Sequence, residues 1–480
     1  MGFKRTIFLT FIITVCFLSL FNAEDQPLLC SQCKCVTLND SSLEVTCSSD
    51  VTSTIFSPSN KSNTSTISKL TVRNNNFNNM TNHFPFENLT ILDLTGNKIV
   101  HIADNIFKKL QKLEILILSY NNIEILQPNS FEGEYEAGDF YPLRSLRTIL
   151  LDHNNLHSLN SDLFEHTEHV EQLSLSHNPL KMIDTHTAIA ITNLVFLKNL
   201  DLSFTQISTL PSSFLHTPRN IEILNLSGNN FTEVPQELKE AHSLKTLLFN
   251  GNPMEKLTRA NGFPKIPTLR ILHLCQMPKL VSIGPGSLAN LTNIEELFIA
   301  GNPLLTRIDD AAIATADNSG TYDIWPSIRK IFLNDNQLSY INRSLLARWD
   351  SLADLDLLNN PWTCECENQW MVETLLPIYL KIDQESAKKM KCAAPIEMSS
   401  FTFEELYNKS YQMRCLDYYG ARPERDAALL VGMLAGLLTG IPIVLFCMYS
   451  YKRHWFGLFD DSPAAFSRQF YTKTNSVYEY

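Results

Sequence analysis

The sequence predicts an α/β solenoid, a curved parallel sheet of about 12 repeats, from three observations. First, the pattern Leu-x-x-Leu-x-Leu-x-x-Asn-x-Leu returns roughly every 24 residues between Ile67 and Trp362. A period of this length is typical of a solenoid in which each repeat adds one strand. Second, two groups of cysteines bracket the repeats. Third, the 480 residues contain only 16 Gly and are 44% hydrophobic, which favours one long core.

Each repeat places a short strand before its motif asparagine. Alternate aliphatic residues such as Leu116 and Leu118 form the buried face of the strand. The asparagine side chain is expected to hydrogen-bond to the backbone of neighbouring turns, where the chain bends. Thr205 and Met277 replace it in two repeats, which predicts a loosened or reshaped bend there. The motif positions are Asn75, Asn97, Asn121, Asn154, Asn178, Thr205, Asn229, Asn252, Met277, Asn302, Asn336 and Asn360.

Aromatic residues recur on the opposite side of the repeat. Phe107, Phe131 and Phe164 each lie ten residues after a motif asparagine, and Phe214 is nearly in register. We expect their rings to stack along the outer curve and fill the core.

Both ends of the chain carry long apolar segments. Lys4 and Arg5 precede an apolar run that ends near Ala23, which is typical of a secretory signal peptide. A second run, 427–451, has no charged residue, is long enough to cross a bilayer as a helix, and is followed by Lys452 and Arg453. This pattern predicts a single-pass type I protein of the plasma membrane with its ectodomain outside.

The predicted organisation follows from these segments. It comprises a signal peptide (1–23), an N-terminal cysteine cap (24–66), the repeats (67–361), a C-terminal cysteine cap (362–416), a juxtamembrane spacer (417–426), a transmembrane helix (427–451) and a short, disordered cytoplasmic tail (452–480).

The charge of the chain limits its partners. The formal net charge is −11, and the negative charge is concentrated between the two apolar runs. An acidic ectodomain argues against nucleic acid and against docking on anionic lipid headgroups. Sequons for N-glycosylation indicate a secretory compartment. They occur at Asn39, Asn60, Asn63, Asn79, Asn88, Asn225, Asn230, Asn290, Asn342 and Asn408.

The cysteine groups cover the two ends of the array. Cys30, Cys33, Cys35 and Cys47 precede the repeats, and the segment NPWTCEC followed by Cys392 and Cys415 comes after them. Spacing alone leaves several disulfide connectivities open, and a zinc site is the alternative for clustered cysteines. Cys275 is left over within the repeats, either as a free thiol or as one partner of an intermolecular disulfide.

The repeats and both cysteine groups resemble those of the extracellular leucine-rich-repeat superfamily. That resemblance implies four cap disulfides, Cys30–Cys35, Cys33–Cys47, Cys364–Cys392 and Cys366–Cys415. The short tail, and a cap that leads almost directly into the membrane helix, are similar to the trophoblast-glycoprotein-like group of single-pass proteins. This similarity implies a role in cell adhesion or in modulation of Wnt signalling. A Toll-type receptor is the alternative in the family, but no intracellular signalling domain follows the membrane helix.

Residues that alternate with the core should line the inner, concave face of the sheet. They form two apolar clusters separated by a polar stretch that contains Gln172, Ser174, Ser176, Asn199, Asp201 and Ser203. Exposed apolar clusters often mark partner surfaces, although a curved sheet also tolerates scattered apolar residues. The predicted ligand surface comprises Ile115, Ile117, Tyr120 and Leu150 in one cluster and Leu248, Ile271, His273, Phe298 and Phe332 in the other.

Other interruptions of the repeat suggest where binding occurs. Asn225 should point onto the concave face, so a glycan there would obstruct a protein ligand at the centre of the array. Two repeats are longer than the rest, and their inserts contain GEYEAGDFYP and ADNSGTYDIW. Such loops either bind partners or are simply tolerated.

Histidines crowd two repeats, with His153 and His177 at equivalent places on adjacent strands. They are either ordinary surface residues or a metal or pH-sensing site. The other members are His157, His166 and His169. No catalytic motif and no cofactor-binding motif occurs, so an enzyme is not expected.

The predicted membrane helix carries Gly432, Gly436 and Gly440, spaced so that two such helices could pack closely as a dimer. Together these features predict a recognition protein, an adhesion molecule or a co-receptor that modulates signalling, with an extracellular or membrane protein as its ligand. The alternative is a ligand-sequestering or scaffold protein that does not signal through its tail.

Overall fold

A computed structural model describes residues 28–39, 42–48, 66–81, 83–136, 139–316, 323–346, 351–415 and 423–453. The chain forms two units, Met1–Cys364 with Asn368–Tyr411 and Glu365–Glu367 with Gln412–Tyr480. The predicted signal peptide and most of the predicted tail lie outside the described residues.

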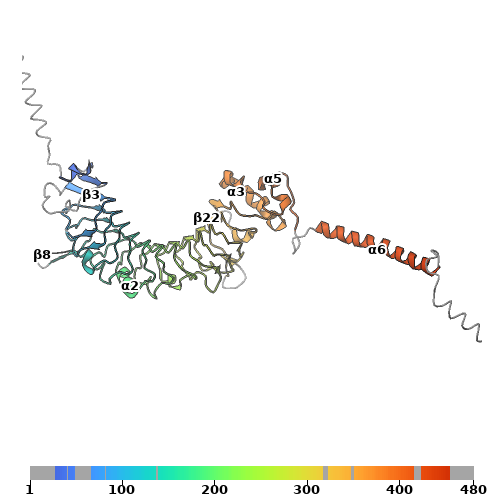
Figure 1. The fold of residues 1–480 in the computed structure, drawn as a ribbon, viewed down its shortest axis with the longest axis horizontal. Helices are drawn as coiled ribbons and strands as arrows, with labels where there is room; N and C mark the ends of the chain where they lie inside the picture. Colours follow the sequence, from blue (N-terminus) through green and yellow to red (C-terminus); the bar gives the residue numbers. More distant parts are fainter. Residues whose placement is uncertain are drawn as a thin grey trace, which may run out of the picture. The chain divides into compact units, whose positions relative to one another are not determined.

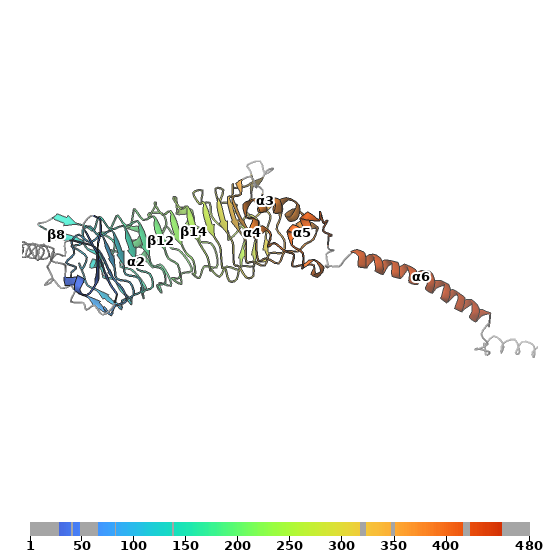
Figure 2. The same ribbon diagram turned by 90° about the horizontal axis from the view of Figure 1, so that it is seen from above.

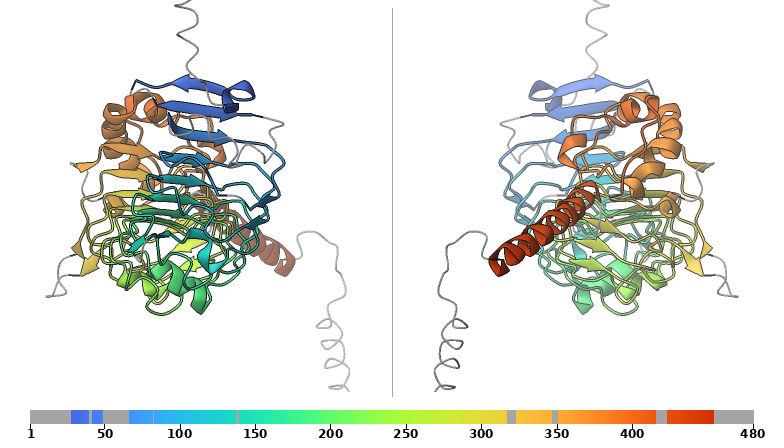
Figure 3. Two further views of the ribbon diagram at one scale, coloured as in Figure 1. Left: turned by 90° about the vertical axis from the view of Figure 1, so that its left-hand side faces the viewer. Right: turned by 90° about the vertical axis from the view of Figure 1, so that its right-hand side faces the viewer.

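The first unit is built on one sheet of 14 strands that lines the inner side of a curved array (Figures 1 and 2). β1 and β2 are antiparallel, and from β2 onward each strand is parallel to the next. The twelve strands from β3 enclose eleven turns, one strand for each predicted motif. Figure 3 shows the stacked strands of this unit from two opposite sides. The predicted parallel-sheet solenoid is confirmed. In sheet order the strands are β1 (Lys34–Thr37), β2 (Leu43–Cys47), β3 (Ile67–Val72), β5 (Ile91–Asp93), β7 (Ile115–Ile117), β10 (Thr148–Leu150), β11 (Gln172–Ser174), β12 (Asn199–Asp201), β13 (Ile223–Asn225), β14 (Thr246–Leu248), β16 (Ile271–His273), β18 (Glu296–Phe298), β22 (Lys330–Phe332) and β23 (Asp354–Asp356).

The motif asparagines form a buried spine beside the sheet. Asn154 Nδ2 donates to the carbonyl of Leu118 in the preceding turn at 2.9 Å and to that of Leu151 in its own turn at 3.1 Å. Its Oδ1 accepts the Ile123 N–H at 3.0 Å. One side chain therefore satisfies three backbone groups where the chain leaves the strand. The predicted role of the asparagines is confirmed.

The bend is not loosened at the two exceptions. Thr205 is fully buried, and its hydroxyl donates to the Leu202 carbonyl at 2.7 Å, as an asparagine amide does. Met277 is also buried, and its N–H donates to Asn302 Oδ1 at 2.8 Å. The bend at Met277 is reshaped instead. Asn302 Oδ1 accepts the N–H of the motif residue itself, whereas Asn154 Oδ1 accepts that of Ile123, two residues beyond Asn121, and the buried Asn302 Nδ2 has no partner among the described residues.

The outer side of the array is packed by phenylalanines and short helices. Rings of Phe84, Phe107, Phe131 and Phe164 stack in sequence, with centroids 5.7, 5.8 and 5.9 Å apart. In the next turn α2 (Thr185–Thr192) builds this side, and Phe214 beyond it is buried. Short segments complete the outer side: β4 (Asn79–Met80) with β6 (His101–Ile102), β15 (Lys256–Leu257) with β17 (Ser282–Ile283) and β19 (Arg307–Ile308), and the 3-10 helices η4 (Pro128–Phe131), η5 (Gln236–Glu240) and η6 (Arg343–Leu346).

Both long repeats fold their inserts into antiparallel hairpins. β8 (Glu134–Glu136) pairs with β9 (Asp139–Tyr141), and β20 (Thr315–Ala316) pairs with β21 (Asp323–Ile324). Each hairpin begins thirteen residues after its motif asparagine, Asn121 or Asn302. Both therefore project from the flank where the chain enters the strands (Figure 2).

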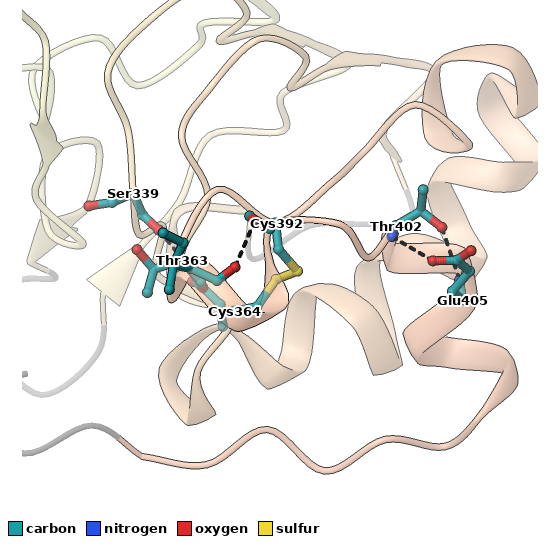
Figure 4. The surroundings of a disulfide bond; sticks show 9 residues. Ser339, Thr363, Cys364, Cys392, Thr402 and Glu405 are labelled. Atoms are coloured by element: carbon teal, nitrogen blue, oxygen red, sulfur yellow. Dashed lines mark hydrogen bonds between the residues drawn. A yellow bond between two sulfur atoms is a disulfide. The ribbon is translucent and has the colours of Figure 1, made fainter. Parts of the chain in front are cut away.

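Disulfides close both ends. At the front, η1 (Leu28–Ser31) contains Cys30, and the disulfides Cys30–Cys35 and Cys33–Cys47 have Cα separations of 5.5 and 4.6 Å. At the back are Cys364–Cys392 and Cys366–Cys415, with Cα separations of 5.5 and 4.8 Å. These are the pairs that the family resemblance implies. Figure 4 shows Cys364–Cys392 near the start of α5, where Thr402 and Glu405 cap each other's backbone N–H. The helices of this end are η8 (Cys366–Asn368), the π-helix η9 (Met371–Leu375), α3 (Leu376–Ile382), α4 (Gln384–Ala387), η10 (Ile396–Met398) and α5 (Phe403–Asn408).

The second unit contains α6 (Pro423–Lys452). Its segment Ala428–Lys452 has 25 residues and a mean hydropathy of 2.4, so by length and composition it could cross a membrane.

Candidate ligand-binding surfaces

The predicted concave residues lie on alternate positions of the strands. In β7, Leu116 is buried while Ile115 and Ile117 on either side of it are half-buried on the inner face. The same alternation leaves the inner residues of β10, β14, β16, β18 and β22 half-buried, including Leu150, Leu248 and Ile271. The strands therefore present a mixed apolar and polar sheet to the inside of the curve.

One apolar cluster forms a continuous patch, which we call the concave patch (Leu248, Ile271, His273, Phe298 and Phe332). Strand register places Leu248, His273, Phe298 and Phe332 in a row. The His273 and Phe298 rings stack with centroids 4.1 Å apart, and those of Phe298 and Phe332 stack at 4.8 Å. Burial lowers the pKa of His273, with Glu296 acting in the opposite direction, so this imidazole favours its neutral form within the stack.

A second row of stacked rings follows the strands β7, β10, β11 and β12. We call it the aromatic ladder, and it comprises Tyr120, His153, His177 and Phe204. Successive ring centroids are 3.9, 4.0 and 4.3 Å apart. Tyr120 is 54% exposed and Phe204 is 50% exposed. Four turns thus display one continuous aromatic edge to solvent.

The ladder occupies backbone positions that disfavour large side chains. Its four residues have φ between +54° and +56°. In the other eight turns this position holds either a glycine, at Gly96, Gly228, Gly251 and Gly301, or a polar residue, at Asn74, Gln276, Asp335 and Asn359. A bulky residue at positive φ is strained by roughly 1–3 kcal/mol, and such strain concentrates at functional sites. The combination of strain and exposure marks the ladder as a candidate binding surface.

Polar groups fix the two imidazoles of the ladder. His153 Nδ1 lies 3.2 Å from Asp152 Oδ2, and Asp152 accepts a hydrogen bond from the Ser119 hydroxyl at 2.6 Å. His177 Nδ1 lies 2.8 Å from Ser176 Oγ. Burial lowers the pKa of His177, and the nearby His153 lowers it further, while Asp201 and Asp152 oppose the shift. At neutral pH the ladder therefore favours an uncharged His177.

His153 and His177 face each other as stacked rings instead of converging on one point. Within the described part of the chain, no group of three His, Cys, Asp or Glu residues could hold a metal ion. His169 lies apart from the ladder and stacks on Phe196 at 5.3 Å.

Phe204 was not among the surface residues predicted from the sequence. It stands directly before Thr205, in the same motif position as Tyr120, His153 and His177. Comparing this one position across all repeats would have revealed the ladder, whereas strand alternation alone does not.

Asn225 lies on the concave face between the two surfaces. It pairs in register with Asp201 on one side and Leu248 on the other, and its Oδ1 accepts the Ser227 N–H at 3.1 Å. A glycan there would stand between the ladder and the concave patch. Of the other sequons, Asn60 and Asn63 lie outside the described residues. Asn39, Asn79, Asn88, Asn230, Asn290, Asn342 and Asn408 lie within them.

Cys275 is half-buried next to the concave patch and is a free cysteine. Its Sγ accepts the Ala300 N–H at 3.4 Å, and burial raises the pKa of the thiol, so the sulfur stays protonated at neutral pH.

Comparison with known proteins identifies the repeat. Models described as leucine-rich repeat match residues 87–134, 144–198 and 220–240. Tsukushi of Gallus gallus is 27% identical over 272 residues, which are 56% of this chain and 67% of that protein. Human Toll-like receptor 3 is 26% identical over 254 residues, which are 46% of this chain and 28% of the receptor.

Among solved structures, the chain is similar at low identity to a human protein. Human 5T4, also titled trophoblast glycoprotein, is 20% identical with a TM-score of 0.43, over 56% of this chain and 94% of that structure. The chain spans from about a quarter to two thirds of the length of the two curated relatives named above. With its twelve stacked parallel strands, its asparagine spine and its terminal disulfides, the chain is a leucine-rich-repeat solenoid that carries disulfides at both ends.

Proposed function

We propose that this chain is a cell-surface recognition protein that binds protein partners through its repeats. In this proposal the signal peptide 1–23 directs it to the secretory pathway, α6 anchors it in the plasma membrane, and the repeats face outward. The two disulfides at each end support an oxidising compartment, and the apolar run Ala428–Lys452 supports a membrane anchor.

The aromatic ladder is the observation that carries the proposal. Large aromatic side chains dominate the energy of protein interfaces because each buries much apolar area with few rotatable bonds. Ile117 and Leu150 pair in register on the adjoining strands, so the ladder borders an apolar area of the sheet. The surface therefore suits a protein partner that covers the ring edges.

The similar proteins named above support an extracellular protein as the partner. We propose further that the partner is a protein that takes part in cell adhesion or signalling. A link to Wnt signalling rests on the resemblance of the cap and short tail to trophoblast-glycoprotein-like proteins. Association through α6 is a further part of the proposal, because Gly432, Gly436 and Gly440 recur every four residues along the helix, a spacing that lets two helices pack closely.

Two measurements on intact cells test this function. The full chain with an epitope after residue 23 should be stained without permeabilisation; staining only after permeabilisation contradicts the proposed topology. Proximity labelling from the ectodomain should then capture surface proteins, and Phe204→Ala and Tyr120→Ala should reduce that capture several-fold.

A matched variant keeps the second measurement specific. Phe196 is 46% exposed, close to the exposure of Phe204, but lies outside the ladder. Phe196→Ala should leave capture unchanged. Equal losses for Phe196→Ala and Phe204→Ala would remove the ladder from the proposal. Deleting residues 456–480 distinguishes the two proposed functions. A receptor that signals through its tail should lose activity, whereas a ligand-sequestering or scaffold protein should lose none.

A further inference from the structure

A column of alternating charges runs along the flank where the chain enters the strands. Its members are the residues directly before β7, β10, β11, β12, β13, β14, β16, β18 and β22. Neighbours in this column form ion pairs: Glu171 with Lys198 at 2.7 Å and with Arg147 at 3.9 Å, Glu222 with Lys245 at 2.9 Å, and Glu295 with Arg270 at 3.2 Å. In order the column reads Glu114, Arg147, Glu171, Lys198, Glu222, Lys245, Arg270, Glu295 and Arg329.

The alternation ends with an excess of positive charge. Lys245 and Arg270 are adjacent in the column, and each is already paired with its own glutamate. The guanidinium of Arg329 takes part in no ion pair or hydrogen bond with the residues that the structure describes, and its side chain is exposed. Arg329 is thus a basic residue on the flank that forms no ion pair with an acidic residue of this column.

A cleft of about 530 Å³ opens at this point of the flank. It is lined by Arg270, Glu295 and Arg329 of the column, by Asn293, and by Trp325 and Pro326. Its volume lies within the range of roughly 300–1,000 Å³ that is usual for ligand sites. Because Glu295 is paired with Arg270, the charge that the cleft offers to a ligand is that of Arg329.

The second insert builds one wall of the cleft. β21 ends at Ile324, and Trp325 follows it directly. Trp325 is half-buried and Pro326 is buried, so the chain leaving the hairpin places an indole beside the arginines. An arginine fork next to an aromatic wall suits a planar anionic group attached to an apolar or aromatic neighbour.

We propose that this cleft binds a carboxylate of an acidic peptide segment on a partner protein, with Arg329 as the anion-binding residue and Trp325 as the apolar wall. The site goes beyond the function proposed above, because it shares no residue with the aromatic ladder or the concave patch. A long polyanion is a poorer fit, because Arg270 is already paired with Glu295 and Arg329 alone offers its charge to a ligand in the cleft.

The test uses the purified full-length chain in detergent and two fluorescent peptides. The acidic probe is GEYEAGDFYP, the chain's own residues 133–142, and the neutral probe is GQYQAGNFYP, which has the same aromatic content. Fluorescence polarisation should show the acidic probe binding about tenfold more tightly than the neutral one. Thr292 of the Asn290 sequon also lines the cleft, so binding is measured before and after enzymatic removal of N-glycans.

Three variants decide whether the cleft is responsible. Arg329→Gln should weaken binding of the acidic probe about tenfold, and Arg329→Lys should give an intermediate loss because it keeps the charge without the fork. Arg219→Gln is the control, since Arg219 is an exposed arginine elsewhere on the array, and it should leave binding unchanged.

Other outcomes overturn the proposal. Equal binding of the two probes, no binding in either glycan state, or equal losses for Arg219→Gln and Arg329→Gln would each exclude a specific carboxylate site. Sialyllactose is included as a competitor. If it binds at Arg329 while the acidic peptide does not, the ligand is a glycan and the peptide assignment is wrong.

Discussion

The ring of Phe204 occupies the space that a side chain at residue 228 would need. A β-carbon built on Gly228 would lie 2.3 Å from Phe204 Cε1 and 2.4 Å from Cδ1. The aromatic ladder therefore ends on a glycine of the next turn, and the last ring is held between His177 and a bare backbone.

Replacing Gly228 by alanine should destabilise the array more than the same change at Gly251. Both glycines have positive φ, +65° and +67°, so each alanine should lose about 1 kcal/mol from backbone strain. Gly251→Ala meets nothing closer than 3.5 Å, whereas Gly228→Ala must displace the Phe204 ring and should lose about 1–3 kcal/mol more. Urea unfolding followed by circular dichroism measures both, and equal losses would contradict the close contact of Phe204 with Gly228.

Removing one spine asparagine should be among the costliest single changes. Asn229 Nδ2 donates to the carbonyls of Leu202 and Leu226 at 2.8 and 3.0 Å, and its Oδ1 accepts the N–H of Thr205 at 3.0 Å. Asn229→Leu leaves these buried groups without partners, which should cost about 3 kcal/mol or more. Thr205→Val removes one hydroxyl and should cost about 1–2 kcal/mol. Thermal unfolding of both variants checks this order, and a smaller loss for Asn229→Leu would refute the spine as a major source of stability.

The stability of the array should fall as the pH drops below about 6.5. The pKa of His177 is lowered in the folded state, chiefly by burial and then by His153, so the unfolded chain binds protons first as the solution is acidified. Stability is then full at high pH and declines through the range below the unfolded pKa. His177→Phe keeps a stacked ring without a titrating group and should make this decline shallower, while His273, whose pKa is also lowered by burial, should keep part of it. Melting temperatures at pH 7.5, 6.5 and 5.5 test the effect, with Tyr120→Phe as the control that keeps the wild-type slope.

The ion pairs of the flank should contribute little. Glu171 bonds to Lys198 at 2.7 Å and lies 3.9 Å from Arg147, but all three side chains are at least 41% exposed. Exposed pairs of this kind are worth about 0–1 kcal/mol and are screened by salt. Glu171→Gln should therefore lose less than about 1 kcal/mol at low ionic strength, and less still in 0.5 M salt. A loss above about 2 kcal/mol, or one that salt does not change, would show that the column is a structural element of the array.

The strands and their register were predictable from the sequence because the same motif recurs in each repeat. Asn154 and Leu116 occupy places that recur along the chain, and the strand register follows from that recurrence. Strand alternation likewise places His273 and Phe298 on the concave face. The backbone conformation after each strand is harder to anticipate. Strand alternation places Tyr120 with the other residues of the concave face, but its positive φ directs the ring into the aromatic ladder.

Features that depend on contacts between distant turns were not predictable from one repeat at a time. The stacking of Phe204 on His177, and the open guanidinium of Arg329 beside Trp325, arise only when turns lie side by side. Pairing of the two inserts into hairpins also depends on local turn geometry that insert length and composition do not specify.

The left-handed residue before each motif asparagine has a consequence for how such arrays diversify. Its side chain leaves the backbone toward solvent, as Tyr120 and Phe204 do, while the core is filled by other positions of the repeat. A change there alters the surface without repacking Leu or Phe inside; its cost is local strain and any contact with the same position of the adjacent turn, as between Phe204 and Gly228. Each turn thus offers one site where new specificity can be acquired while the interior stays as it is, and four consecutive turns of this chain hold aromatic rings at that site.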